Sequence, residues 1–111
     1  MDSNKNESKE SEVNNEAVVE QTIRELCYIL KKSEDENFIY DFFNCLFTPP
    51  ELKDFANRWI LVKELDKGTT QREIARKYGM SLCKITRGSR ELAKAESAFR
   101  KILNFQKAHK D

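Results

Sequence analysis

Apolar residues recur at helical spacing along most of this chain, and no segment shows the alternation of a strand. Residues 17–32 carry a broad apolar helical face, and residues 49–67 and 98–107 predict two further helices. The segment 38–47 is apolar on nearly all sides, so a helix there must be buried on most of its surface. One small subunit does not readily bury such a helix. The pattern therefore predicts an all-α protein of about six helices and favours an interlocked homodimer.

Short local signals predict where these helices begin and end. Ser33, Thr48 and Thr70 are each followed three places later by glutamate. In such a capping box the two residues satisfy each other's free backbone N–H groups at a helix start. Gly68 and Gly79 suit helix ends, because glycine adopts the left-handed backbone conformation at little cost.

Residues 70–91 predict a helix-turn-helix. Gly79 would make the turn, and Ser81 can cap the second helix. The inner apolar faces of the two helices would be formed by Ile74, Ala75, Tyr78, Leu82 and Ile85. A helix-turn-helix lays its second helix in the major groove of DNA, which makes duplex DNA a candidate partner.

Positive charge is concentrated in this segment, although the whole chain carries a net charge of only +1. Between residues 70 and 90 Glu73 is the only acid, against the basic residues Arg72, Arg76, Lys77, Lys84, Arg87 and Arg90. Segregated charge of this kind is typical of phosphate binding, and the alternative is a solvated basic face. Residues 1–16 are polar and acidic and predict a disordered tail, so the helical domain is expected over residues 17–107.

Composition narrows the possible functions further. A length of 111 residues allows one small domain, without an apolar run that could span a bilayer or serve as a secretory signal. Cys27, Cys45 and Cys83 are widely spaced, which favours reduced cysteines used as small apolar side chains in a cytoplasmic protein. With one histidine, His109, we expect no metal site and no cofactor. No nucleophile has a base near it in a recognisable arrangement, so we do not expect an enzyme.

A series of short strings is more specific than a generic helix-turn-helix. Thr48-Pro is followed by Arg58, by Gln71-Arg-Glu-Ile, by Gly79 and by Ile85-Thr-Arg-Gly-Ser89. In this order they resemble the Trp repressor family over roughly residues 17–105. The resemblance implies an intertwined homodimer with two DNA-reading heads. It also implies L-tryptophan as corepressor, bound between the core and each head of a repressor of tryptophan biosynthesis or uptake genes.

The resemblance also implies roles for individual residues. By position, Arg58 and Arg87 would hold the indole between their guanidinium planes, and Thr48 and Arg87 would meet the carboxylate. The backbone carbonyls of Cys45 and Phe47 would receive the ammonium group, and Gly88 would leave room beside the ring.

Several of these residues could serve a purely structural or DNA-binding role instead, and among the ligand positions Glu91 departs from the family pattern. Thr48 already has a role as a helix cap, Arg58 could pair with Asp54, and Arg87 could contact phosphate. Glu91 stands where well-studied members have a serine that helps to hold the ammonium group. A glutamate there could pair with the ammonium or crowd the pocket.

The predicted DNA contacts cluster around the second helix of the motif. Base reading is expected from its first turn and phosphate binding from the basic and hydroxyl side chains around it, with affinity that falls as salt rises. These residues are Gln71, Arg72, Lys77, Met80, Ser81, Leu82, Cys83, Lys84, Thr86, Arg87, Ser89 and Arg90. The alternatives are a related DNA-binding regulator with another effector or none, and a helical interaction module without a DNA target.

Overall fold

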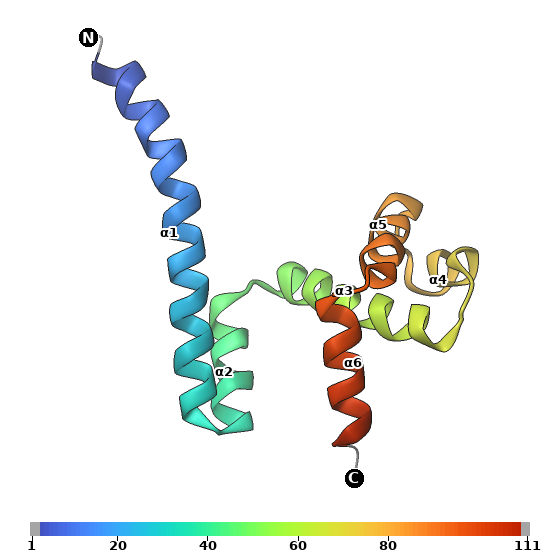
Figure 1. Ribbon diagram of the computed structural model, residues 1–111. Coiled ribbons are helices and arrows are strands. Elements are labelled where there is room, and N and C mark those ends of the chain that lie inside the picture. Colours follow the sequence, from blue (N-terminus) through green and yellow to red (C-terminus); the bar gives the residue numbers. More distant parts are fainter. Residues whose placement is uncertain (1–2, 110–111) are drawn as a thin grey trace. The chain divides into compact units, whose positions relative to one another are not determined.

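The computed structural model describes the backbone of residues 3–109 and the side chains of residues 15–109. Six helices follow one another along this part of the chain (Figure 1). They are α1 (Ser3–Ser33), α2 (Glu36–Leu46), α3 (Pro49–Lys67), α4 (Gln71–Tyr78), α5 (Leu82–Ala93) and α6 (Ala98–Ala108). The predicted all-α class with about six helices is confirmed. The chain divides into two compact units, residues 1–46 and 47–111, which are described separately below.

The first unit consists of α1 and α2, which pack side by side as a helical hairpin (Figure 1). Helix α1 begins at Ser3, well before the start near Ala17 that the apolar pattern predicts. Residues 3–16 contain neither glycine nor proline, so nothing in the sequence stops a helix from propagating through them. The side chains of residues 1–14 lie outside the described part of the chain, and the disordered acidic tail over residues 1–16 stays a prediction.

The prediction that Ser33 caps the helix after it is wrong. Ser33 is the last residue of α1, and its hydroxyl donates to the Leu30 carbonyl at 2.8 Å instead of starting the next helix. Glu34 has a φ of 47° and reverses the chain direction. Asp35 then caps α2, because its carboxylate accepts a hydrogen bond from the Phe38 N–H at 3.2 Å.

The first unit leaves much apolar surface exposed. None of the residues in α2 is buried, and Phe38 and Tyr40 are 51% and 65% exposed. Large apolar side chains of α1 and α2 that are exposed in the single chain are Val18, Val19, Ile23, Tyr28, Ile29, Phe38, Tyr40 and Leu46. A hairpin of this kind does not cover its own apolar faces, so the burial predicted for the helix at residues 38–47 is not met within the first unit.

The second unit has its core where α3, α4 and α5 meet. Leu61, Ile74 and Ile85 are buried against one another, and the partly buried residues Leu65, Ala75, Tyr78 and Met80 pack around them. The predicted inner positions Ile74 and Ile85 are confirmed. Leu82, which the spacing also placed on the inner face, is instead 58% exposed. Leu82 is the first residue of α5, and Met80 from the preceding turn packs against the core in its place.

Glycine and serine signals around the helix-turn-helix are confirmed. Gly68 and Gly79 have φ values of 89° and 65° and follow the ends of α3 and α4. Ser81 caps α5, since its hydroxyl accepts a hydrogen bond from the Lys84 N–H at 3.3 Å.

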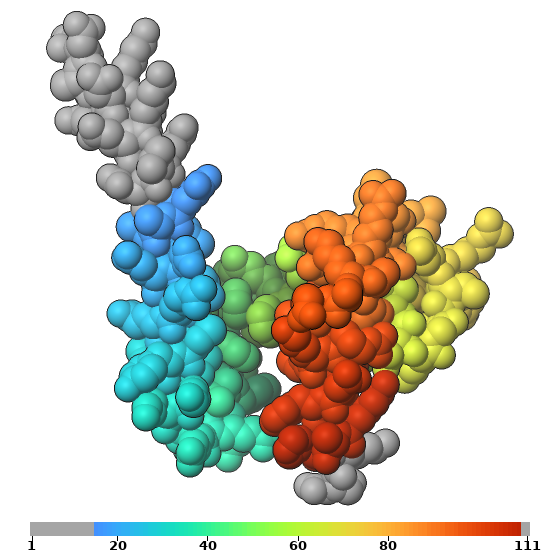
Figure 2. Space-filling model, in the orientation of Figure 1, coloured from blue at the N-terminus to red at the C-terminus, as the bar shows by residue number. Residues whose placement is uncertain are grey.

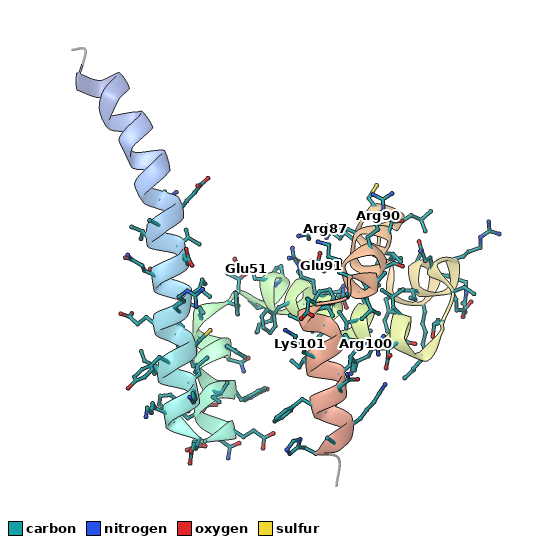
Figure 3. The ribbon with its side chains drawn as sticks, in the orientation of Figure 1. Glu51, Arg87, Arg90, Glu91, Arg100 and Lys101 are labelled. Atoms are coloured by element: carbon teal, nitrogen blue, oxygen red, sulfur yellow. The ribbon has the colours of Figure 1, made fainter. Side chains whose placement is uncertain are left out.

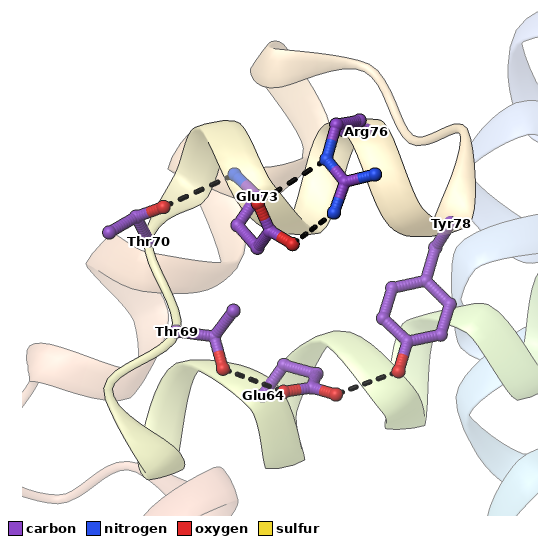
Figure 4. Close-up of polar contacts among 6 residues, drawn as sticks. All are labelled: Glu64, Thr69, Thr70, Glu73, Arg76 and Tyr78. Carbon is purple, nitrogen blue, oxygen red and sulfur yellow. Dashed lines mark hydrogen bonds and ion pairs between the residues drawn. The ribbon is translucent and has the colours of Figure 1, made fainter.

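Of the two capping boxes in this unit, one is complete and the other is half formed. Thr48 and Glu51 bond reciprocally, with Glu51 N–H to the threonine hydroxyl at 3.4 Å and Thr48 N–H to the carboxylate at 2.9 Å. At the second box the Thr70 hydroxyl accepts from the Glu73 N–H at 3.2 Å. The Glu73 carboxylate instead pairs with Arg76 one turn further along α4 (Figure 4). A charged partner on the same helix face therefore replaces the second bond of the box.

A buried carboxylate ties α3 to α4. Glu64 is 7% exposed and accepts hydrogen bonds from the Tyr78 hydroxyl and the Thr69 hydroxyl, both at 2.7 Å (Figure 4). These two bonds, the Tyr78 bond first, hold the pKa of Glu64 below its ordinary value of 4.5. The ionised carboxylate thus links the end of α3 to the last residue of α4.

A second carboxylate attaches α6 to the same helix. Asp66 accepts from Arg100 at 2.7 Å and from Lys107 at 2.8 Å, both on α6. The hydrogen bonds from Lys107 and Arg100 lower the pKa of Asp66. Leu103 lies between these two cations in sequence and is 2% exposed, so α6 combines an apolar anchor with two ion pairs.

The Glu64 network predicts a pH-dependent stability. Because the folded state lowers the pKa of Glu64 below its ordinary value of 4.5, the unfolded chain binds more protons as the pH falls through this range. The stabilisation is therefore present above about pH 4.5 and is lost below it. Tyr78→Phe removes the largest cause of the lowered pKa, so we expect a lower free energy of unfolding at pH 7 and a weaker decline towards pH 3.

Urea unfolding followed by circular dichroism at a series of pH values measures this difference. Tyr40→Phe is the matched control, since Tyr40 is exposed, and it should change the free energy of unfolding by less than about 0.5 kcal/mol. A Tyr78→Phe variant with the pH dependence of the wild type would contradict the assignment.

Candidate nucleic-acid and ligand site

Helices α4 and α5 pack against each other and are joined by residues 79–81. Ile74 and Ile85 are fully buried between the helices of the second unit. A hydrogen bond from the Thr86 hydroxyl to the Gln71 side-chain carbonyl, at 3.2 Å, joins α5 to the first residue of α4. The structure thereby brings two predicted DNA contacts together from positions far apart in the sequence.

Most of the predicted DNA contacts lie on the outer face of this pair. Three of them, Met80, Thr86 and Ser89, are half-buried. The exposed ones are Gln71, Arg72, Lys77, Ser81, Leu82, Cys83, Lys84, Arg87 and Arg90. Met80 packs against the core, which gives it a structural role that the sequence did not indicate. The three cysteines are free, as expected, and exposed in the single chain, so their use as small apolar packing side chains stays a prediction.

An open hollow runs along α5 and is bordered by both apolar and basic side chains. Its lining residues are Leu82, Cys83, Thr86, Arg87, Arg90, Glu91 and Lys94. Figure 3 shows Arg87, Arg90 and Glu91 extending from this helix, and Figure 2 shows α5 at the surface of the second unit. The hollow contains two of the predicted corepressor residues, Arg87 and Glu91, together with five further side chains of the same segment.

Glu91 is paired within the hollow. Its carboxylate contacts the Lys94 ammonium at 2.9 Å, one turn further along the chain, and both side chains are largely exposed. The position that departs from the family pattern therefore carries a negative charge whose partner is already present.

Arg58 forms the ion pair with Asp54 that its position on the helix allows. Its guanidinium lies 3.3 Å from the Asp54 carboxylate, one turn earlier on α3. The other oxygen of Asp54 contacts the Lys84 ammonium of α5, also at 3.3 Å. The hydrogen bond from Lys84 is the largest cause that lowers the pKa of Asp54, and the nearby charge of Arg58 lowers it further. One carboxylate thus connects a predicted ligand residue with a predicted DNA contact.

Gly88 allows α5 to approach α3 closely. It is buried, and a Cβ atom at this position would lie 2.9 Å from Cδ2 of Leu61. Such a distance is shorter than van der Waals contact. Packing against the core residue Leu61 is therefore a reason for glycine here, independent of the predicted room beside an indole ring.

The remaining predicted ligand residues lie around the start of α3. Thr48 completes the capping box, and the Phe47 ring lies 5.2 Å from the Phe55 ring. Cys45 is exposed and belongs to the first unit. The carbonyl groups of Cys45 and Phe47 as ammonium acceptors stay a prediction.

Comparison with known proteins decides the family. A family model described as Trp repressor protein matches residues 21–107, most of the chain. The chain belongs to the Trp repressor family. Members of this family regulate transcription and are not enzymes, in agreement with the prediction from the sequence.

The curated relatives are similar over most of their lengths. A Trp operon repressor homolog of Chlamydia trachomatis serovar L2 is 40% identical over 76 residues, which cover 68% of this chain and 81% of that protein. A homolog of the same description from Chlamydia caviae is 40% identical over 80 residues, covering 71% and 76%. One from Xylella fastidiosa strain M23 is 35% identical over 74 residues, covering 66% and 80%. No solved structure matches this chain.

None of the described helices combines the length and apolar character needed to cross a membrane. Among the described side chains, no group of three or more histidine, cysteine, aspartate or glutamate residues is placed to hold a metal ion.

Sequence reasoning missed three side chains that matter at this site. Leu61 faces Gly88, Glu64 holds Tyr78, and Asp54 holds Lys84. The first two contacts join residues 27 and 14 places apart and the third joins residues 30 apart, so no helical spacing reveals them. Only the contact from Asp54 to Arg58, one turn apart on α3, had a sequence signal.

The close approach at Gly88 can be tested by a double-mutant cycle. Gly88→Ala gains about 1 kcal/mol of helix propensity but overpacks Leu61, which costs about 1–3 kcal/mol. We expect a net loss of up to about 2 kcal/mol in the free energy of unfolding. Leu61→Val removes the Cδ2 atom that the new methyl group would meet. In that background Gly88→Ala should be neutral or stabilise by up to about 1 kcal/mol.

Urea denaturation of the four proteins measures the coupling between the two positions. An equal cost of Gly88→Ala with leucine and with valine at position 61 would show that the packing contact is not the reason for glycine.

Proposed function

We propose that this Trp repressor family member is a cytoplasmic, sequence-specific DNA-binding repressor that places α5 in the major groove. The observation that supports this most strongly is the division of the α4–α5 pair into two faces. Ile74 and Ile85 are fully buried on the inner face, while most of the predicted DNA contacts are exposed on the outer face. A recognition helix needs this combination, because rigid packing fixes where the exposed side chains meet the groove.

The first turn of α5 would read bases and its surroundings would bind phosphate. Ser81, Leu82, Cys83 and Lys84 are exposed at this helix start. Arginine and lysine side chains such as Arg72 supply the positive charge that neutralises phosphates and positions the protein on the duplex.

We propose further that the protein acts as a homodimer. The first unit exposes large apolar side chains of both α1 and α2, and the hairpin itself does not cover them. A second copy of the chain would bury this surface and supply a second reading head. Two heads related by a twofold axis would recognise two half-sites about one helical turn apart, or a multiple of that spacing.

L-Tryptophan is the proposed corepressor. The support is the family membership and the description of the relatives as Trp operon repressor homologs. Arg87 lies in the hollow along α5, and a planar guanidinium can both stack on an aromatic ring and fork onto a carboxylate. The other proposed contacts are Cys45, Phe47, Thr48, Arg58, Gly88 and Glu91. Bound ligand would favour the head orientation that fits DNA, and so repress genes of tryptophan biosynthesis or uptake.

Glu91 supports a second candidate, a related DNA-binding regulator with a different effector. Its carboxylate, paired with Lys94, adds a negative charge to the hollow that also holds Arg87. Because Lys94 already pairs with this carboxylate, the carboxylate is less available to the ammonium group of tryptophan, and an effector that does not need this contact would suit the hollow better.

DNA binding can be tested by fluorescence anisotropy with a labelled duplex at several salt concentrations. If about six phosphates are neutralised, the slope of log affinity against log salt should be about −5. Arg72→Gln should reduce the magnitude of this slope by about 1. Lys31→Gln on α1 is the matched control and should leave it unchanged. Absence of binding at low salt, or binding that is insensitive to salt, would favour a helical interaction module.

The ligand can be tested by calorimetric titration and equilibrium dialysis with L-tryptophan. We expect saturable binding at one site per chain, and loss of that binding in Arg87→Ala, because the guanidinium would contact both the indole and the carboxylate. Circular dichroism checks that the variant is folded. Binding by Glu91→Ser but not by the wild type would favour the second candidate, and no binding by either protein would contradict the tryptophan proposal.

A further inference from the structure

Asp54 lies between two cations that come from different helices. Its Oδ1 atom contacts the Lys84 ammonium of α5 at 3.3 Å, and its Oδ2 atom contacts the Arg58 guanidinium of α3 at 3.3 Å. The Asp54 side chain is 46% exposed and that of Lys84 61% exposed, so the pair lies at the surface where water and other anions have access.

Lys84 is the member of this cluster that belongs to the proposed DNA-reading surface. It is the third residue of α5 and lies in the turn that would enter the major groove. The ammonium group of a lysine is a compact charge on a flexible stem, so it can move from one anion to another. It can neutralise a DNA phosphate fully only by leaving the carboxylate of Asp54.

The arrangement keeps the free energy needed to separate Lys84 from Asp54 small. When the ammonium leaves, Arg58 still contacts the other carboxylate oxygen, so Asp54 keeps an ion-pair partner. The carboxylate is also ionised at neutral pH, since Lys84 and then Arg58 lower its pKa below the ordinary value of 3.8. The competing anion is therefore present under the conditions in which the protein would meet DNA.

We propose that Asp54 is an internal competitor for DNA at Lys84, and that it reduces the affinity of the protein for duplexes that offer no stronger partner to this lysine. In the free protein the Asp54 carboxylate is the ion-pair partner of the Lys84 ammonium, and in the complex a DNA phosphate would take its place. A duplex must displace the Asp54 carboxylate before Lys84 adds to the binding affinity. A DNA sequence that brings a phosphate or a guanine within contact distance of the ammonium displaces the carboxylate most completely. The inference rests on the proposed DNA binding and assigns to Asp54 a role in specificity.

The experiment compares the full-length wild type with Asp54→Asn, Lys84→Gln and the double variant. Each protein is titrated at low salt into a labelled duplex of mixed sequence, about three helical turns long, and affinity is measured by fluorescence anisotropy. Because an exposed ion pair is worth little, we expect Asp54→Asn to bind about two- to five-fold more tightly. The magnitude of its salt slope should grow by up to about 0.9, the value for one additional phosphate. In the Lys84→Gln background the same substitution should have no effect.

Glu73→Gln controls for the general effect of removing a negative charge. Glu73 pairs with Arg76, which is not among the proposed DNA contacts, so this variant should change affinity less than Asp54→Asn does. Thermal unfolding of each variant checks that all are folded.

Three results would overturn the inference, and they are distinguishable. Equal affinities of wild type and Asp54→Asn would show that the carboxylate does not compete. An equal gain from Asp54→Asn with lysine and with glutamine at position 84 would show general charge repulsion instead. No binding by any of the proteins at low salt would overturn the proposed DNA binding itself and the inference with it.

Discussion

The burial of Ile74 and Ile85 against Leu61 is the contact on which the proposed DNA-reading head depends. These residues come from α4, α5 and α3, so one apolar cluster sets the positions of three helices. Gly88 permits the close approach of α5 to Leu61 that this cluster requires. Once the inner face is fixed in this way, the outward direction of side chains such as Lys84 follows from helix geometry. The proposed DNA contacts are thus a consequence of packing on the opposite face.

Carboxylates on α3 add polar contacts that hold the neighbouring helices to it. Glu64 holds the end of α4, Asp66 holds α6, and Asp54 holds Lys84 of α5. Each is an anion on the central helix that meets a donor or cation from a helix packed against it. Of these three carboxylates, Asp54 is the one that forms an ion pair with a cation of the α4–α5 surface, Lys84. The α4–α5 segment stays basic overall in a chain whose net charge is only +1.

Features set by neighbouring residues could be predicted from the sequence. The Thr48 capping box, the glycines that follow α3 and α4, and the buried positions Ile74 and Ile85 all depend on spacings of one or two helical turns. The sequence did not predict that Met80 packs against the core while Leu82 stays exposed, because periodicity does not say which of two nearby apolar residues the turn directs inward. Long-range contacts such as Asp54 with Lys84 have no local signal at all.

The ligand site is harder to predict than the helix-turn-helix for a physical reason. Its proposed residues come from both units, since Cys45 lies in the first and Arg87 in the second. Short-range patterns predict each helix but carry no information on how separate units assemble. The exposed apolar faces of α1 and α2 show the same limit, because the pattern of a helix does not say what covers its apolar face.

In the proposed function, two copies of the α4–α5 pair together read a DNA sequence. Selection of bound duplexes from a library of random sequence, with and without L-tryptophan, would reveal this reading. We expect enrichment of an inverted repeat whose half-sites are separated by about one helical turn or a multiple of it, and stronger enrichment when the amino acid is present. Bound duplexes with the same composition as the starting library in both conditions would contradict the claim.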